Sequence, residues 1–350
     1  MAEEIKHQGS TTWCSPSNIA LVKYWGKYGR QLPSNPSISL TLSQAYTETS
    51  VDYKIIDQPR WQFTFEGKEK PEFEKKVVNF LASIKDVFPL VERLDLKIDS
   101  RNTFPHSSGI ASSASSMSAL AMCLVDIAGT INAEDNLNLK LASELARLGS
   151  GSASRSIYGP VVIWGDNDTV KAASNQYAIP YKEVADIFST YHDDILIISK
   201  SEKSVSSRAG HALMENNPYA LNRYEQAHRH LGEIIAAMGA GDLEKFGSIV
   251  EKEALTLHAL MMASEPPYML MEPNTLAAIN SIQSFRKEKS IPVYFTLDAG
   301  PNLHLLYPDE YVSDLIPLKE ELITFCADGR IIEDRTGTGP LKKNKKERLV

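Results

Sequence analysis

The chain has 350 residues, of which 43% are hydrophobic and 23% are charged, and its net charge is −7. These proportions are ordinary for a soluble globular protein with one large domain or two modest ones, and the negative charge argues against general nucleic-acid binding, which usually needs a basic face. The three scattered cysteines do not suit a disulfide scaffold and the polar N-terminus lacks an apolar signal core, so we expect a cytoplasmic protein with reduced thiols.

The first half of the chain alternates between strand-like and helical patterns. Strands show a period of two, whereas amphipathic helices repeat every three to four residues. These patterns predict strands over Ser37–Leu42, residues 45–65 and Leu94–Ile98, and helices over Phe73–Phe88 and Asp135–Leu148, the last with Gly149 as its C-cap.

The second half continues with the same mixture. The patterns predict strands at Val161–Trp164, Ile195–Ser199, Val293–Leu297 and Leu303–Tyr307, helical structure from Pro218 to Ser264 with a break at Gly239–Gly241, and a helix over Thr275–Lys287. Because there is no strict βαβ rhythm, an α+β fold is favoured over a doubly wound sheet. The loop-rich segment 165–192 is the best domain boundary, which predicts domains over residues 1–190 and 191–350. The basic run Lys342–Arg348 is interpreted as a solvated tail.

The stretch Asn102–Val125 contains no Asp, Glu, Lys or Arg, and its second half has helical spacing. Helix N-termini normally gain from a carboxylate, so the absence of one is compatible with a bound anion that takes its place. A Ser/Ala-rich helix packed closely on a sheet explains the composition equally well. The stretch matches neither a Walker A nor a dinucleotide loop, and its serine content argues against a membrane span.

Two further segments could bind an anion. Lys23 and Lys27 flank Tyr24-Trp25 and could neutralise a phosphorylated ligand, although isolated lysines are more often surface charges. In the segment from Gly149 to Tyr158, Arg155 stands among alternating serines, which suits a carboxylate or a phosphate. A serine-rich cap with a structural ion pair is an equally good interpretation of that segment.

Two smaller features complete the set. Ser206, Ser207 and Arg208 could bind a phosphate, but a plain ST-turn is favoured on local grounds. Asp298 follows an apolar strand and precedes a Gly-Pro turn, where a carboxylate could orient or deprotonate a hydroxyl. As an isolated feature, such an aspartate is more often an Asx-turn residue.

Four motifs, NIALVKYWGK, PHSSGIASSASS, ARLGSGSASRSIYG and TLDAGPN, follow one another in that order. Together they resemble the signature set of the mevalonate diphosphate decarboxylase family, within the GHMP kinase superfamily. The resemblance runs from about Pro16 to Tyr307. The middle phosphate loop is shared across the superfamily, whereas the other motifs together are specific to the decarboxylase branch.

The resemblance implies a fold and a reaction. The fold would be α+β and GHMP-kinase-like, with an ATP-binding N-terminal half like ribosomal protein S5 domain 2, a ferredoxin-like C-terminal half and the site in a cleft between them. The reaction would be the ATP-dependent decarboxylation of (R)-5-diphosphomevalonate to isopentenyl diphosphate, ADP, phosphate and CO2, in the mevalonate pathway of isoprenoid biosynthesis. The implied cofactors are ATP and Mg2+, and the resemblance gives no metal ligands.

The resemblance also implies roles for particular residues. Asp298 would orient or deprotonate the C3 hydroxyl, Lys23 would lie near the reacting phosphate, and Arg155 would hold the substrate. The remaining roles are substrate binding by Tyr24, Lys27, Ser150, Ser152, Ser207 and Arg208, and binding of the ATP phosphates by Ser107, Ser108, Gly109, Ala111, Ser112 and Ser113.

The sequence departs from the family pattern at three places. Ser154 stands where Cys is common, Pro160 stands where Gly is common, and His211 stands where Met is common. The alternative functions are a mevalonate 5-phosphate decarboxylase, a mevalonate 3-kinase-like enzyme and a non-catalytic nucleotide sensor. As partners we expect a small-molecule substrate and neither nucleic acid nor membrane, and a homodimer is one assembly that the sequence allows.

Overall fold

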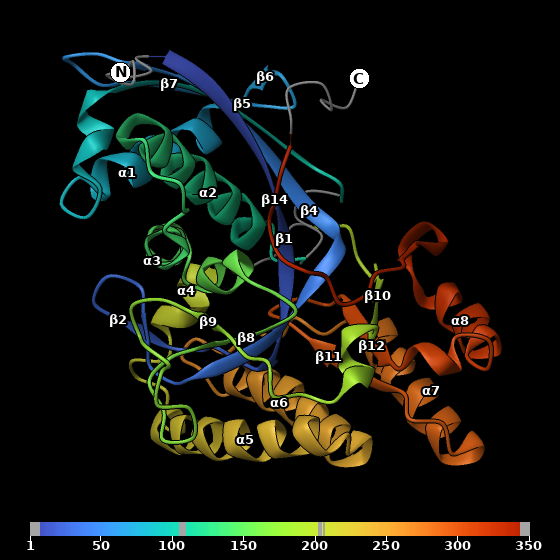
Figure 1. The fold of residues 1–350 in the computed structure, drawn as a ribbon. Coiled ribbons are helices and arrows are strands. Elements are labelled where there is room, and N and C mark those ends of the chain that lie inside the picture. The colour runs from blue at the N-terminus through green and yellow to red at the C-terminus, as the bar shows by residue number, and fades with distance from the viewer. Residues whose placement is uncertain (1–7, 105–109, 202–204, 206, 344–350) are drawn as a thin grey trace.

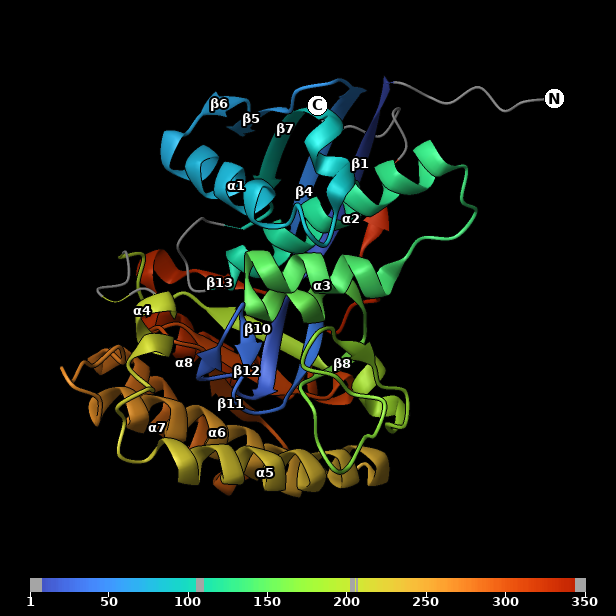
Figure 2. The ribbon, with the colours of Figure 1, turned by 90° about the vertical axis from the view of Figure 1, so that its left-hand side faces the viewer.

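Two mainly antiparallel sheets, with helices packed against them, form the protein (Figures 1 and 2). The structure is a computed structural model that describes residues 8–104, 110–201, 205 and 207–343, without the side chains of residues 207 and 208. Because the sheets are mainly antiparallel and the helices are grouped apart from the strands, this is an α+β fold, as the sequence predicts.

The larger sheet is built on two long strands, β1 (Gln8–Val22) and β4 (Ser37–Ile55), which pair along most of their length. Within the described residues its strand order is β14-β1-β4-β7-β5-β6, and β8 and β9 extend the far end of β4. The other strands of this sheet are β5 (Arg60–Phe65), β6 (Lys68–Glu69), β7 (Leu94–Asn102), β8 (Val161–Trp164), β9 (Ile179–Pro180) and β14 (Leu341–Lys342).

The smaller sheet belongs to the second half of the chain. Its order is β11-β12-β10-β13, with β10 (His192–Leu196), β11 (Tyr294–Leu297), β12 (Leu303–Tyr307) and β13 (Ile331–Ile332). A separate hairpin joins β2 (Lys27–Tyr28) to β3 (Leu32–Pro33).

The helices divide between the sheets: α1 to α3 lie in the upper part of Figure 2, and α5 to α8 lie in the lower part with the smaller sheet. The α-helices are α1 (Pro71–Ser83), α2 (Ser112–Asn132), α3 (Leu139–Gly149), α4 (Ser207–Ala212), α5 (Ala220–Ala240), α6 (Leu243–Met262), α7 (Pro273–Lys289) and α8 (Ile316–Leu322). The short 3-10 helices are η1 (Pro89–Arg93), η2 (Gly151–Ile157), η3 (Asp186–Ser189), η4 (Asp309–Tyr311), η5 (Ile323–Phe325) and η6 (Ala327–Gly329).

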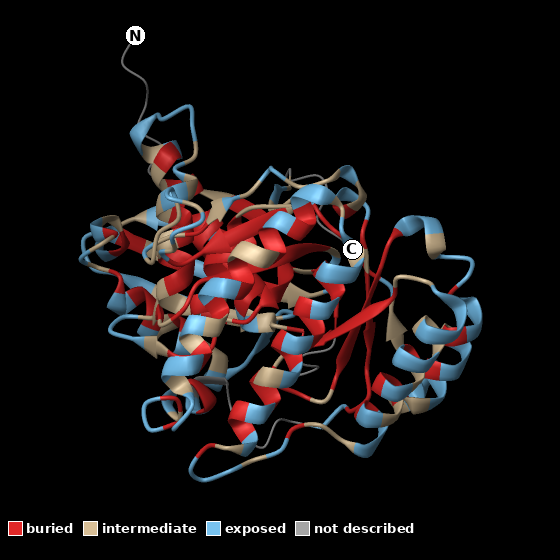
Figure 3. Ribbon diagram, turned by 90° about the horizontal axis from the view of Figure 1, so that it is seen from below, coloured by how far each residue is buried: buried red, intermediate tan, exposed pale blue. Residues whose placement is uncertain are grey.

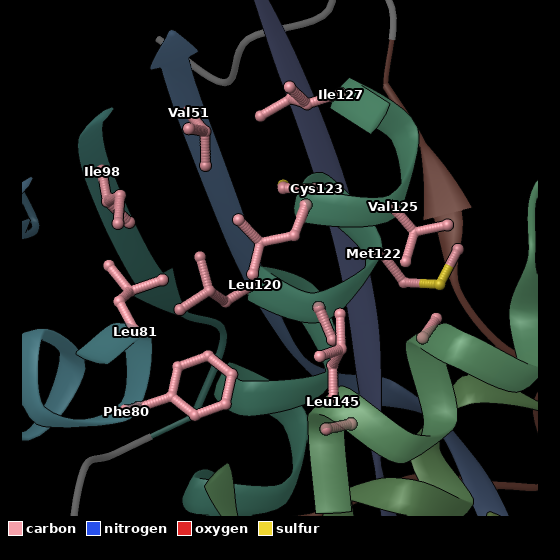
Figure 4. Close-up of a cluster of buried hydrophobic side chains, with 14 of the residues drawn as sticks. Val51, Phe80, Leu81, Ile98, Leu120, Met122, Cys123, Val125, Ile127 and Leu145 are labelled. Carbon is pink, nitrogen blue, oxygen red and sulfur yellow. The ribbon is translucent and has the colours of Figure 1, made fainter. Parts of the chain in front are cut away.

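Helix α2 forms the centre of the first core. Its Leu120 and Cys123 pack toward Val51 of β4 and Ile98 of β7 (Figure 4). Buried residues concentrate in the central strands and on the helix faces turned toward them (Figure 3). Among the described residues, α2 alone is long and apolar enough to cross a membrane, but 72% of its apolar window is buried inside the protein, as in a core helix. A membrane span over this stretch was rejected because of its serine content, but α2 is apolar enough to span a membrane. Its burial inside the protein is the better reason.

Several predicted elements are confirmed. Strands Val161–Trp164 and Leu303–Tyr307 have the predicted ends. The predicted break between α5 and α6 is also present. Gly241 has a φ of 69°, the left-handed conformation in which glycine often ends a helix, and the Asp242 side chain caps α6 by accepting from Lys245 N.

Other boundaries were wrong for identifiable reasons. The first helix ends at Ser83 because the amides of Val87 and Phe88 turn back to the Ile84 carbonyl ahead of Pro89. Helix α3 begins only after Asn138, whose side chain caps Leu141 N. Gly149 is the last residue of α3 and not its cap. A Cβ there would lie 2.6 Å from Met117 Sδ, so glycine serves close packing against α2.

Two strands were misplaced or missed. The strand predicted at Ile195–Ser199 instead runs over His192–Leu196, because Asp193 and Asp194 are buried with polar partners. Asp193 pairs with His304 at 2.6 Å. The 15-residue strand β1 was not predicted as a whole, since it is buried on both faces from Thr11 onward and its Ser and Thr residues give no apolar alternation to recognise.

The basic run was predicted to be a solvated tail, and its first two residues are not. Lys342 lies in β14, which pairs with β1 beside Trp13 and Cys14 (Figure 1). Its ammonium group lies 2.7 Å from Asp126, and Lys343 lies 2.7 Å from Glu48. The remainder of the run is outside the described residues, and the domain division at residue 190 remains a prediction.

Candidate active site

Lys23 and Asp298 meet where the two sheets approach each other. Lys23 directly follows β1, Asp298 directly follows β11, and Lys23 Nζ donates to Asp298 Oδ1 at 3.0 Å. The lysine side chain is 1% exposed and the aspartate 28% exposed. The expectation that an isolated Lys23 is a surface charge is therefore wrong, and the partly exposed carboxylate can reach a ligand.

The buried position of Lys23 affects its proton affinity. Burial lowers the pKa of Lys23, and the charge of Asp298 opposes that shift. Because the lysine is fixed behind the carboxylate, the pair presents an ionised carboxylate to which a hydroxyl can donate, with a positive charge close behind it.

Arg155 lies close to this pair, on η2. Its Nε donates to Asn18 Oδ1 at 3.2 Å and its Nη1 donates to Ser37 Oγ at 2.7 Å. The side chain is buried, and within the described part of the chain it forms no ion pair, which argues against the structural ion pair considered above. Burial lowers the pKa of Arg155 to about 10, while Asp298 acts in the opposite direction.

A buried guanidinium with only neutral partners is suited to an incoming anion. Asn18 fixes it, because Asn18 Nδ2 also donates to Ser156 Oγ at 2.8 Å and to the Ser152 carbonyl at 3.2 Å. Asn18 was given no role from the sequence. Its place as the first residue of the NIALVKYWGK motif is the feature that could have indicated one.

Ser150 and Ser152 precede Arg155 in the same segment, and Ser150 reaches the start of α2. Ser150 Oγ lies 3.2 Å from Ser113 Oγ. Gly151, between the two serines, packs so closely that a Cβ would lie 2.7 Å from the Tyr24 hydroxyl. The structure thus brings the GSGS segment, Tyr24 and the N-terminus of α2 together.

The start of α2 is built without an internal cap. Ala111 is left-handed with a φ of 39° and makes no side-chain cap, and the first turn, which contains Ser112 and Ser113, carries no acidic residue. The Ala114 N–H donates to the Ala111 carbonyl at 2.7 Å, whereas no described side chain caps the helix, so its first turn could accept an anion. Ser17 Oγ fixes the preceding chain through the Ile110 carbonyl at 2.9 Å. Ser107, Ser108 and Gly109 lie outside the described residues.

Tyr24 and Lys27 lie beside His211 of α4. The His211 ring is centred 4.4 Å from Tyr24 and 4.5 Å from Trp25, and its Nδ1 accepts the Gly26 N–H at 3.0 Å. Burial lowers the pKa of His211 to about 3, and Lys27 adds to the shift, so this histidine is neutral. Burial also raises the pKa of Tyr24, whose buried hydroxyl has no hydrogen-bond partner among the residues that the structure describes.

Ser207 and Arg208 lie in the first turn of α4. Ser207 precedes His211 by four residues in the same helix. Ser206 lies outside the described residues, and the structure describes Ser207 and Arg208 as helical instead of the favoured ST-turn. Their side chains are not described, so their predicted contact with a diphosphate remains a prediction.

Metal binding was left open by the sequence. Among the described residues, no group of three or more His, Cys, Asp or Glu side chains could hold a metal ion. Mg2+ usually keeps several waters and needs only one or two carboxylates with substrate phosphates, so the lack of a larger cluster among the described residues does not argue against it.

Known proteins resemble both halves of the chain. A model described as diphosphomevalonate decarboxylase-like N-terminal domain matches residues 15–176, and a model described as mevalonate 5-diphosphate decarboxylase C-terminal domain matches residues 194–347. A diphosphomevalonate decarboxylase of Ganoderma lucidum is 30% identical over 331 residues, which cover 88% of this chain and 80% of the relative.

Solved structures agree with these matches. MDDEF in complex with MVAPP, AMPPCP and magnesium superposes with a TM-score of 0.83 at 29% identity, over 97% of this chain and 100% of the other. Mevalonate diphosphate decarboxylase from Staphylococcus aureus also gives a TM-score of 0.83 at 29% identity, over 96% of this chain and 98% of the other.

Proposed function

The chain belongs to the diphosphomevalonate decarboxylase family, and we propose that it carries out the reaction of that family, the ATP-dependent decarboxylation of (R)-5-diphosphomevalonate to isopentenyl diphosphate, ADP, phosphate and CO2. The observation that carries the proposal is the pairing of Lys23 Nζ with Asp298 Oδ1 at 3.0 Å, close to a buried Arg155 that lacks an ion pair among the described residues. The names of the relatives favour the diphosphate over the monophosphate ester.

In the first step, Asp298 accepts the proton of the C3 hydroxyl as its oxygen attacks the terminal phosphorus of ATP. Phosphoryl transfer needs alignment and charge neutralisation more than covalent help from the protein. Lys23, fixed beside Asp298, supplies positive charge next to the oxygens that are transferred. Bound ATP supplies the phosphoryl group that converts a tertiary hydroxyl into a leaving group.

In the second step, the C3–O bond breaks, phosphate departs, and the electrons of the bond to the carboxylate form the new double bond as CO2 leaves. Arg155, with Ser150 and Ser152, holds the substrate carboxylate until that bond breaks. Neutral Asn18 and Ser37 fix the guanidinium without neutralising it. A single arginine positions the carboxylate while leaving it able to lose CO2.

Two other parts of the site would bind the phosphate groups of ATP and the diphosphate of the substrate. Ala111, Ser112 and Ser113 at the carboxylate-free start of α2, with the loop of Ser107, Ser108 and Gly109, would hold the ATP phosphates. Support comes from MDDEF, which binds AMPPCP, magnesium and MVAPP. Mg2+, when bound, would neutralise the phosphate charge. Tyr24, Lys27, Ser207 and Arg208 would bind the diphosphate of the substrate.

The cellular context is proposed on the same basis. The enzyme would be cytoplasmic and act on a small molecule, with neither nucleic acid nor membrane as a partner, and its oligomeric state is to be measured. Residues 1–190 would form the ATP-binding domain and residues 191–350 the second domain, with β14 returning to the first sheet.

The test is to incubate the enzyme with ATP and Mg2+ together with either the diphosphate or the monophosphate of mevalonate, and to measure ADP and CO2 at once. Equal amounts of ADP and CO2 from the diphosphate support the proposal. ADP without CO2 would identify a 3-kinase, and preference for the monophosphate would identify a mevalonate 5-phosphate decarboxylase. The absence of both products would indicate a nucleotide sensor.

A further inference from the structure

Helix α6 contacts the backbone of both members of the Lys23–Asp298 pair. Glu253 Oε2 accepts the N–H of Lys23 at 2.9 Å, and His258 Nε2 donates to the carbonyl oxygen of Asp298 at 3.1 Å. Glu253 is 0% exposed and His258 is 2% exposed. One helix of the second half therefore holds the residue that follows β1 and the residue that follows β11.

Glu253 is itself fixed by two side chains of α5, those of Arg223 and His230. Arg223 donates to both of its carboxylate oxygens, at 2.8 and 2.5 Å, and His230 Nδ1 lies 2.5 Å from Oε1. Arg223 Nη2 also donates to the carbonyl oxygen of Lys23 at 3.0 Å. Both the N–H and the C=O of Lys23 are thus bound by one buried ion pair.

We propose that α6 is the positioning element of the site: Glu253 and His258 set the separation of Lys23 Nζ and Asp298 Oδ1 by holding the two backbones. The inference rests on the proposed function. Neither side chain touches the reacting groups in this arrangement, so both are positioning residues. Phosphoryl transfer depends on alignment to within a fraction of an ångström, and a displacement of about 1 Å can cost roughly 100-fold in rate.

The arrangement has a plain structural alternative, in which the buried ion pair and His258 only fasten α6 to its neighbours. The two interpretations differ in what a small loss of contact changes. If α6 only fastens the fold, its variants lower the melting temperature and leave the chemistry of the folded enzyme intact. If it positions the pair, the rate of the folded enzyme falls while substrate affinity stays the same.

The sharpest test compares His258→Leu with His258→Gln, because the Gln side chain retains an N–H that can donate to the Asp298 carbonyl. Leu255→Ala, on an exposed face of the same helix, is the matched control. For His258→Leu we expect kcat to fall about tenfold or more, with KM for ATP and for diphosphomevalonate within about twofold of wild type. His258→Gln should recover most of the rate, and Leu255→Ala should match wild type.

A pH profile adds a readout that loss of packing does not move. Among the described residues, Lys23 and Arg155 are cations whose charges act on Asp298, and an opposite charge nearby stabilises a carboxylate. If His258→Leu lets Asp298 move away from Lys23, the acidic limb of kcat shifts to higher pH, by about half a unit or more. The limb of Leu255→Ala should stay in place.

The role of Glu253 is tested by replacing both Arg223 and Glu253 with Met. Replacing both residues avoids leaving one buried charge without its partner. The same kcat loss at unchanged KM is expected. Two results would overturn the inference: a wild-type kcat in His258→Leu, or equal losses of kcat in His258→Leu and His258→Gln with an unmoved acidic limb. In either case an active wild-type enzyme would still support the proposed function. A wild-type enzyme that releases no CO2 would overturn both.

Discussion

The Lys23 ammonium group lies 3.0 Å from the Asp298 carboxylate, although 275 residues separate them along the chain. The lysine side chain is 1% exposed and the aspartate 28% exposed, so the carboxylate faces outward with the cation behind it. This order suits a base that must meet a substrate hydroxyl while its own charge is kept stable.

Asp298→Asn keeps the size of the side chain and removes both the proton acceptor and the charge. We expect kcat to fall by roughly 10²–10⁴-fold with little change in ATP affinity, because general-base catalysis contributes about that much. ADP and CO2 release should fall together, since phosphorylation precedes decarboxylation. A variant that forms ADP at the wild-type rate without CO2 would move Asp298 to the second step.

Arg155→Lys tests substrate clamping against a structural role. Lysine lacks the planar fork that reaches Asn18 and Ser37, so catalysis should drop by about 100-fold. The melting temperature should change little, because Arg155 forms no ion pair among the described residues. Calorimetry beside steady-state kinetics separates the cases: a large fall in melting temperature with normal activity would favour the structural role.

Ser113→Glu places a carboxylate in the exposed first turn of α2. It should leave stability unchanged or raise it by about 0.3–1 kcal/mol through the helix dipole, while weakening ATP binding at least about tenfold by charge repulsion. Thr130→Glu, at the exposed far end of the same helix, is the control and should bind ATP normally. Unchanged ATP affinity in both variants, measured by calorimetry, would remove α2 from the nucleotide site.

His211→Met tests the consequence of burying a neutral histidine. Burial lowers the pKa of His211 to about 3 from its ordinary value of 6.5, so below pH 6.5 the unfolded chain binds a proton that the folded chain does not. Stability from this source is complete above pH 6.5 and is lost as pH falls toward 3. Between pH 6.5 and 5 the loss is about 2 kcal/mol.

In His211→Met that loss should disappear, so its unfolding free energy should fall less steeply than that of the wild type over this range. Urea unfolding of both proteins at pH 5 and pH 7 measures the difference. Parallel pH dependence in the two proteins would show that His211 titrates normally and is not buried neutral as the geometry indicates.

Local sequence predicted what depends on local chemistry. Apolar runs bounded by turn residues identified β8, β11 and β12, and the glycines at 239–241 marked the end of α5. Asp298 stood out because a carboxylate followed a strand and preceded a Gly-Pro turn. These features are set by a few neighbouring residues, and tertiary contacts had little to change.

What the sequence did not predict depends on partners far away in the chain. Lys23 looked like a surface lysine because nothing beside it indicates Asp298. Glu253 and Arg223 were given no role from the sequence, because 30 residues separate them, yet both are buried as an ion pair in which each neutralises the other. Strand β10 was shifted for the same reason, since His304 makes a buried Asp193 acceptable inside a strand.

The pairing of β14 with β1 has a consequence for how this protein is made. Translation produces β1 first, and its edge beside Trp13 and Cys14 stays uncovered until Leu341 and Lys342 leave the ribosome. An uncovered strand edge is a template on which other chains can pair. Nascent chains and fragments that stop short of β14 are therefore the forms most exposed to aggregation, and an interaction that covers this edge during synthesis would protect them.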